Sequence, residues 1–65
     1  NIVANAIMSL APAVPGLMAD DAVFIASGII DSRKDEVIAA LDAAGLAVLE
    51  VKEKRGWECI VCKKA

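Results

Sequence analysis

The stretch Ala22-Val23-Phe24-Ile25-Ala26-Ser27-Gly28 decides the fold class of this chain. Its first five residues form an unbroken apolar run with β-branched members, which is typical of a strand covered on both faces in a parallel sheet. We expect the strand to cover Ala22–Ala26 and to end at Ser27-Gly28, because glycine permits a sharp turn or a close backbone approach. Ser27 and Gly28 fit either the rim of a ligand site or a plain strand-to-helix turn.

A helix is predicted directly after this strand. Ser32-Arg33-Lys34-Asp35 fits a capping box, and Asp35 and Glu36 are favoured in a first turn by the helix dipole. Gly45 stands where a C-terminal cap is expected. The apolar positions recur at helical spacing and predict a buried face made of Val37, Ile38, Leu41 and Ala44.

Two further strands are predicted over Leu46–Lys54 and Trp57–Lys63, joined by a tight hairpin turn at Arg55-Gly56. In the second of them, Trp57, Cys59 and Val61 alternate with Ile60 and Cys62. A right-handed crossover makes the first two strands of the chain parallel. The last strand is then antiparallel to its hairpin partner, and it can lie either between the other two strands or outside them.

Upstream of the first strand, the sequence predicts a helix over about Ala4–Met18. Pro12 and Pro15 interrupt it, so we expect a kink or two short helical pieces. Asp20-Asp21 forms the following turn. The face that packs on the sheet is predicted from the spacing of Ile7, Leu10, Val14, Leu17 and Met18.

Composition excludes several classes of protein. The chain has 65 residues, 58% of them hydrophobic, and a net charge of -2, so it has neither the size for several domains nor the basic face of a nucleic-acid-binding protein. The uncharged residues 1–19 contain two Pro, two Asn, a Ser and a Gly and have no basic flank. They favour a buried helix over a membrane span or a signal peptide. We therefore expect a cytoplasmic protein with no membrane contact and no direct contact with nucleic acid.

Cys59 and Cys62 have the C-x-x-C spacing of some metal and redox sites. A structural zinc site needs four ligands, and the chain has two Cys and no His. Residues three apart on a strand point to opposite faces, so we expect two buried thiols and no metal site.

Trp57 is expected to pack beside the hairpin. The lysines and arginine near the hairpin and tail are interleaved with glutamates and predict a solvated face made of Lys52, Lys54, Arg55, Lys63, Lys64, Glu50, Glu53 and Glu58.

The chain opens at Asn1-Ile2-Val3-Ala4, in full apolar sequence and without an initiator methionine. We interpret residues 1–65 as the closing portion of a larger α/β domain. The strand Ala22–Ala26 then has an apolar edge without a partner, so we expect the isolated piece to self-associate or to be poorly stable as a monomer.

Several segments together resemble the end of the PrmA family, the methyltransferases of ribosomal large-subunit protein eleven. These segments are Asn1-Ile2-Val3-Ala4, Leu10-Ala11-Pro12, Phe24-Ile25-Ala26-Ser27-Gly28-Ile29-Ile30, Lys34-Asp35-Glu36-Val37-Ile38, Gly45-Leu46 and Gly56-Trp57. Each motif is short, and their order and spacing over the whole chain carry the resemblance. The chain departs from the family's usual residues at Asn5-Ala6, where Asp or Gly is more common, and at Asp20-Asp21, where the turn usually contains Gly.

This resemblance implies the C-terminal part of a Rossmann-like class I methyltransferase fold that uses S-adenosyl-L-methionine. The first four strands and the Gly-rich cofactor loop are expected upstream. The three strands of this chain are then the fifth, sixth and seventh, in a mixed sheet of order one-three-two with the last strand antiparallel. The implied substrate is a ribosomal large-subunit protein, methylated on lysine and on its N-terminal amine.

Asn1 is the one site residue that the resemblance implies, as a contact to the cofactor after the fourth strand. An amide suits that place because it both donates and accepts hydrogen bonds without adding charge. The sequence does not identify the catalytic residues, and the isolated piece is expected to be inactive. The alternative hypothesis is a small α/β interaction module without catalysis.

Overall fold

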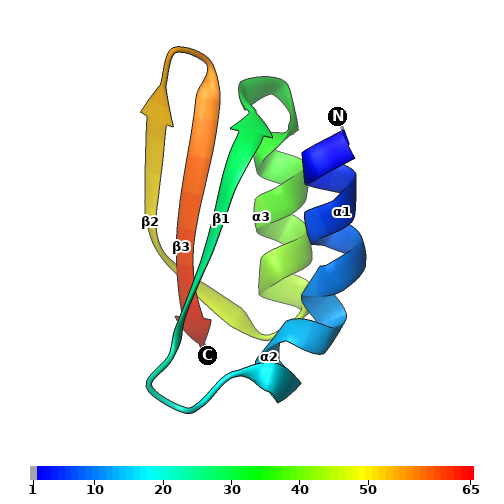
Figure 1. Ribbon diagram of the computed structural model, residues 1–65, viewed down its shortest axis with the longest axis vertical. Coiled ribbons are helices and arrows are strands. Elements are labelled where there is room, and N and C mark those ends of the chain that lie inside the picture. The colour runs from blue at the N-terminus through cyan, green and yellow to red at the C-terminus, as the bar shows by residue number, and fades with distance from the viewer. Residues whose placement is uncertain (1) are drawn as a thin grey trace.

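The computed structural model describes residues 2–65 as a three-stranded sheet with helices packed against one of its faces (Figure 1). The predicted order of helix, strand, helix, strand and strand is confirmed, with the first helix in pieces. The elements are α1 (Ile2–Leu10), η1 (Ala11–Ala13), α2 (Val14–Leu17), β1 (Val23–Ile30), η2 (Asp31–Arg33), α3 (Lys34–Ala43), β2 (Leu46–Lys54) and β3 (Trp57–Lys64).

The sheet has the order β1-β3-β2, so the last strand lies between the other two. This is the order that the family resemblance implies, and the antiparallel direction of the last strand is confirmed. The expected mixed sheet is corrected in one respect. Both pairings among the described residues are antiparallel, because β1 and β2 run in the same direction but are separated by β3.

Strand β1 is longer than the sequence predicts, and the expectation that it ends at Ser27-Gly28 is wrong. Ala26 pairs with Ile60 and Ile29 pairs with Glu58, so one extra residue of β1 is accommodated as a bulge. Gly28 has a φ of +78° there, a conformation that side-chain-bearing residues rarely adopt. The glycine therefore bends the strand within its pairing with β3, and pairing continues beyond it.

The predicted interruption of the first helix is confirmed. The chain leaves α1 at Leu10, forms the single turn η1 and resumes as α2, with Pro12 and Pro15 each near the start of one of these short pieces. Proline is tolerated in a first turn, where its missing N–H would have no helical partner. The helix begins at Ile2, two residues before the predicted Ala4.

The second helix is capped differently from the prediction. The capping box at Ser32 is wrong, because residues Asp31–Arg33 form a 3-10 turn and α3 begins only at Lys34, without a side-chain cap. The N–H of Lys34 bonds to the carbonyl of Asp31, which supplies a backbone partner at this end. At the other end, the prediction for Gly45 is confirmed by its φ of +91° and its N–H bond to the carbonyl of Asp42.

The hairpin turn at Arg55-Gly56 is also confirmed. Both residues have positive φ, 54° and 84°, as a two-residue hairpin turn of the favoured hand requires. The N–H of Gly56 donates to Oε2 of Glu53 at 2.7 Å, and the carbonyl of Gly56 accepts from the N–H of Asp31 at 2.8 Å. The turn is therefore fastened to the end of β1.

The core lies between the helices and the sheet. Its completely buried large side chains come from β1, α3 and β3, together with Leu46 at the start of β2. All the strand residues of the core lie on one face of the sheet. The members of the core are Ala4, Ala11, Val14, Ala26, Ile29, Val37, Leu41, Leu46, Ile60 and Cys62. None of the helices formed by residues 2–65 is long and apolar enough to cross a membrane.

The opposite face of the sheet is open, and its β1 side is apolar. Val23 and Ile25 on β1 are 54% and 62% exposed, and Trp57 on β3 is 52% exposed. The described residues therefore cover only one face of β1, whereas the sequence predicts cover on both. Trp57 packs only in part, against the expectation that it packs beside the hairpin.

Candidate functional site

The carboxyl ends of β1 and β2 lie at one end of the sheet, together with the first turn of α1 and the start of α3 (Figure 1). In open α/β sheets, ligands bind outside the carboxyl ends of the parallel strands. This end of the molecule is therefore the candidate site. Asn1, the cofactor contact implied by the family resemblance, lies outside the described residues.

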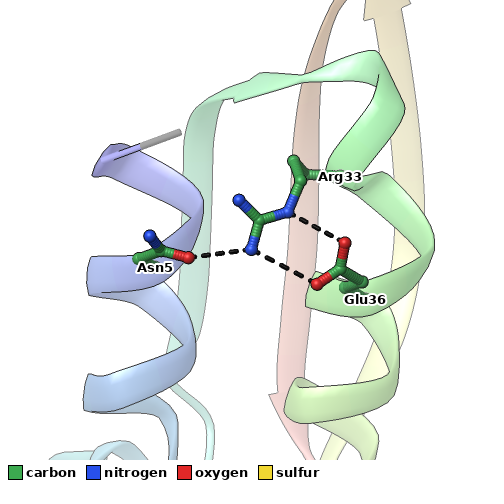
Figure 2. Close-up of polar contacts among 3 residues, drawn as sticks. All are labelled: Asn5, Arg33 and Glu36. Atoms are coloured by element: carbon green, nitrogen blue, oxygen red, sulfur yellow. Dashed lines mark hydrogen bonds and ion pairs between the residues drawn. The ribbon is translucent and has the colours of Figure 1, made fainter.

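Arg33 joins the elements that meet at this end (Figure 2). Its Nε donates to Oε1 of Glu36 at 2.9 Å, and its Nη2 donates to Oε2 of the same carboxylate at 3.2 Å. The same Nη2 donates to Oδ1 of Asn5 in α1 at 2.8 Å. The guanidinium thus connects the first turn of α3 with the first turn of α1, and we refer to Asn5, Arg33 and Glu36 as the arginine bridge.

A second contact ties the start of α1 to β1. A Cβ atom added to Gly28 would lie 3.7 Å from Cγ1 of Val3, so the bulge of β1 sits directly against the first turn of α1. Ser27 and Gly28 are both exposed at this place. They therefore lie close to the candidate site and not in a turn away from it.

Glu58 is the only charged residue among residues 2–65 that is fully buried, with 2% of its surface exposed. It lies in β3 between Ile29 of β1 and Glu53 of β2, and no described residue donates a hydrogen bond to either carboxylate oxygen. The expectation of a solvated Glu58 is thus wrong. Strand alternation places it on the same face as Ile60 and Cys62, and that pattern was already readable in the sequence.

The neighbouring carboxyl group of Asp31 raises the pKa of Glu58 above its ordinary value of 4.5. A protonated Glu58 can donate to the Asp31 carboxyl group, whereas two charged carboxylates repel each other, and Asp31 is the largest cause of the shift. Burial and the negative charges of Asp31 and Glu53 act in the same direction, whereas the positive charge of Lys34 opposes them. Folding therefore shifts the ionisation equilibrium of Glu58 toward its neutral form.

Replacing Glu58 by glutamine should change how stability depends on pH. Because the pKa is raised on folding, the stability that Glu58 contributes is fully present below pH 4.5 and is lost as the pH rises through the raised pKa. Glu58→Gln keeps the neutral shape and removes this loss. We expect the melting temperature of the variant to rise relative to that of the wild type as the pH increases from below to above 4.5.

The control for this prediction is Glu50→Gln, which removes a carboxylate that is 54% exposed on β2. Its pH profile should follow that of the wild type. If the difference in melting temperature between Glu58→Gln and the wild type stays constant over this range of pH, Glu58 ionises alike in the folded and unfolded chains, and the prediction is wrong.

The two cysteines do not come together. Cys62 is buried on the helix-facing side of β3, whereas Cys59 is half-buried on the opposite side, and both thiols are free. Burial raises the pKa of the Cys62 thiol. The prediction that the two thiols point to opposite faces is confirmed, and residues 2–65 contain no group of three or more His, Cys, Asp or Glu side chains that could hold a metal ion.

Two lysines near the hairpin and tail form ion pairs, one with a neighbouring acid on β2 and the other with Asp20 in the loop before β1. Nζ of Lys52 lies 3.8 Å from Oε2 of Glu50, and Nζ of Lys64 lies 3.4 Å from Oδ1 of Asp20. This agrees with the predicted solvated face at these positions.

Comparison with known proteins gives the chain its family. A family model described as "Ribosomal protein L11 methyltransferase (PrmA)" matches residues 1–65. The chain belongs to the PrmA family. Relatives named ribosomal protein L11 methyltransferase include one from Agathobacter rectalis, 41% identical over 64 residues, which cover 98% of this chain and 20% of the relative. A second, from Heliobacterium modesticaldum, is 40% identical over 65 residues, which cover 100% of this chain and 21% of the relative.

A third relative with the same name, from Desulfitobacterium hafniense, is 47% identical over 57 residues, which cover 88% of this chain and 18% of the relative. The chain therefore spans about a fifth of the length of the curated relatives it matches.

The arginine bridge of this PrmA segment was not predicted from the sequence. The spacing of three between Arg33 and Glu36 was a local signal for one half of it, but nothing in the sequence pointed from Arg33 to Asn5.

Proposed function

We propose that this chain is the carboxyl-terminal part of the cofactor-binding domain of a methyltransferase that uses S-adenosylmethionine. In this proposal the enzyme methylates amino groups of ribosomal protein L11, on lysine and at the N-terminal amine. The observation that carries the proposal is the PrmA family match over the whole chain. The strand order β1-β3-β2, with β3 antiparallel to both neighbours, agrees with a Rossmann-like class I methyltransferase domain.

The residues at the carboxyl end of β1 suit one wall of a cofactor site. Gly28 is exposed and carries no side chain, so a ligand can approach the backbone closely, and the neighbouring Ser27 offers an exposed hydroxyl. Under the proposal, the amide of Asn1 holds a polar group of the cofactor or an incoming amine. Residues 2–65 enclose no pocket of their own, and the rest of the site is assigned to the remainder of the protein.

S-adenosylmethionine, when bound, supplies a methyl group on a positively charged sulfur. Transfer to an amine needs a neutral nitrogen in line with the bond that breaks, so positioning supplies much of the rate. The contribution of this chain is to present Asn1 and the β1 bulge in fixed places. We propose that the protein acts in the cytoplasm with ribosomal protein L11 as its partner, and that residues 1–65 alone are inactive.

A methyl-transfer assay tests this function. The full-length protein is incubated with methyl-labelled S-adenosylmethionine and purified ribosomal protein L11, and modified residues are mapped by mass spectrometry. We expect label on lysine side chains and on the N-terminal amine of L11, and none when residues 1–65 replace the full-length protein. Failure of the full-length protein to label L11 would favour an interaction module without catalysis.

A further inference from the structure

We propose that Arg33 is a positioning residue for the cofactor site, which holds the start of α1 at the carboxyl end of β1. The inference rests on the proposed function and adds to it a residue that touches neither cofactor nor substrate. It acts through the arginine bridge on the turn of α1 that follows Asn1.

The geometry of the bridge fixes the direction of the guanidinium. Glu36 accepts from two different nitrogens of Arg33, so the planar group is held in one orientation. Nη2 carries two hydrogens. One is used by Glu36 and the other by Asn5, at 3.2 Å and 2.8 Å respectively. A lysine at this position lacks the fork and cannot make the same three bonds.

Asn5 lies about one helical turn after Asn1 in the sequence. Fixing Asn5 toward α3 therefore fixes the direction in which α1 begins. Val3 lies beside the bulge of β1 on the other side, since its Cγ1 would be 3.7 Å from a Cβ atom built on Gly28. The two contacts hold the first turn of α1 from two sides, toward α3 and toward β1.

The arginine bridge contributes little to overall stability. Its hydrogen bonds lie at the surface, where the Glu36 side chain is 57% exposed and the Arg33 side chain 23% exposed. Exposed ion pairs of this kind have small effects on folding. The helix is already attached to the core through Ala4, and the following turns through Ala11 and Val14. Losing one positioned hydrogen bond to the cofactor, in contrast, weakens cofactor binding about tenfold.

The test compares variants of the full-length protein by calorimetric titration with S-adenosylmethionine and by melting temperature. Arg33→Gln and Asn5→Leu each break the bond between α1 and Arg33, and each should weaken cofactor binding about tenfold with little change in melting temperature. The double variant should lose no more than either single variant, since both remove the same bond. Asn5→Asp keeps an acceptor for Arg33 and should bind as tightly as the wild type.

Lys52→Gln is the matched control, because it also removes one positive charge but lies on β2 with its side chain 67% exposed. It should bind the cofactor like the wild type. The positioning role is overturned by unchanged affinity in Arg33→Gln and Asn5→Leu, by affinity losses that add in the double variant, or by losses that follow a matching fall in melting temperature. It is also overturned if Asn5→Asp is as weak as Asn5→Leu. A wild-type protein that binds no cofactor would instead refute the proposed function.

Discussion

Residues 1–65 produced alone should sediment as dimers or larger assemblies, and the same chain with Ile25→Lys should be a monomer. The reason lies in β1, which pairs with β3 along one side and has no strand partner along the other among residues 2–65. Its outward face is apolar, with Val23 and Ile25 more than half exposed. An exposed apolar edge of this kind is a template for pairing with another chain.

The other edge of the sheet is protected by its sequence. The second half of β2 alternates acidic and basic residues, Glu50, Lys52, Glu53 and Lys54, and charges on an edge strand disfavour pairing with a second chain. We therefore expect association through β1. A lysine at Ile25 introduces the same kind of protection there.

Analytical ultracentrifugation over a range of concentrations measures this association. Leu49→Lys is the matched control, since Leu49 is 54% exposed on β2 and the substitution adds the same charge at the opposite edge. It should leave the assembly unchanged. A strict monomer with a sharp melting transition that does not depend on concentration would contradict the expectation.

Much of the fold was predictable from the sequence because its signals were local. An unbroken apolar run marked the first strand, and alternation marked the last one. The two prolines marked the break in the first helix, and Gly45 and Arg55-Gly56 marked a helix end and a turn. Each of these features depends on residues close in the chain. The position of β3 between β1 and β2 was not decided by the pattern and came from the family resemblance.

The errors arose where a distant partner decided the outcome. The strand β1 continues past Gly28 because β3 lies alongside it, and the predicted cap at Ser32 is replaced by the turn Asp31–Arg33, which begins where the Asp31 N–H is bonded to Gly56 of the hairpin. Arg33 finds Asn5 only after α1 and α3 have packed side by side. Such contacts join residues far apart in the sequence, 25 positions for Asp31 and Gly56 and 28 for Arg33 and Asn5, and leave no periodic trace.

Replacing Asn1 by alanine should weaken the binding of S-adenosylmethionine. Under the proposed function the amide of Asn1 contacts the cofactor, and Asn1→Ala leaves the polar group it held without that partner. Hydrogen bonds to charged groups contribute about 1.5–3 kcal/mol, so we expect the affinity for S-adenosylmethionine to fall roughly tenfold to a hundredfold. The start of α1 should stay in place, since the arginine bridge and the contact between Val3 and Gly28 do not involve Asn1.

Calorimetric titration of the full-length protein with S-adenosylmethionine, with and without Asn1→Ala, tests most directly the claim that this chain forms one wall of a cofactor site. We expect one bound cofactor per wild-type chain, a tenfold or greater increase in Kd for Asn1→Ala, and an unchanged melting temperature without ligand. Equal dissociation constants for the two proteins would contradict the role of Asn1. Absence of binding to the wild-type protein would contradict the claim itself.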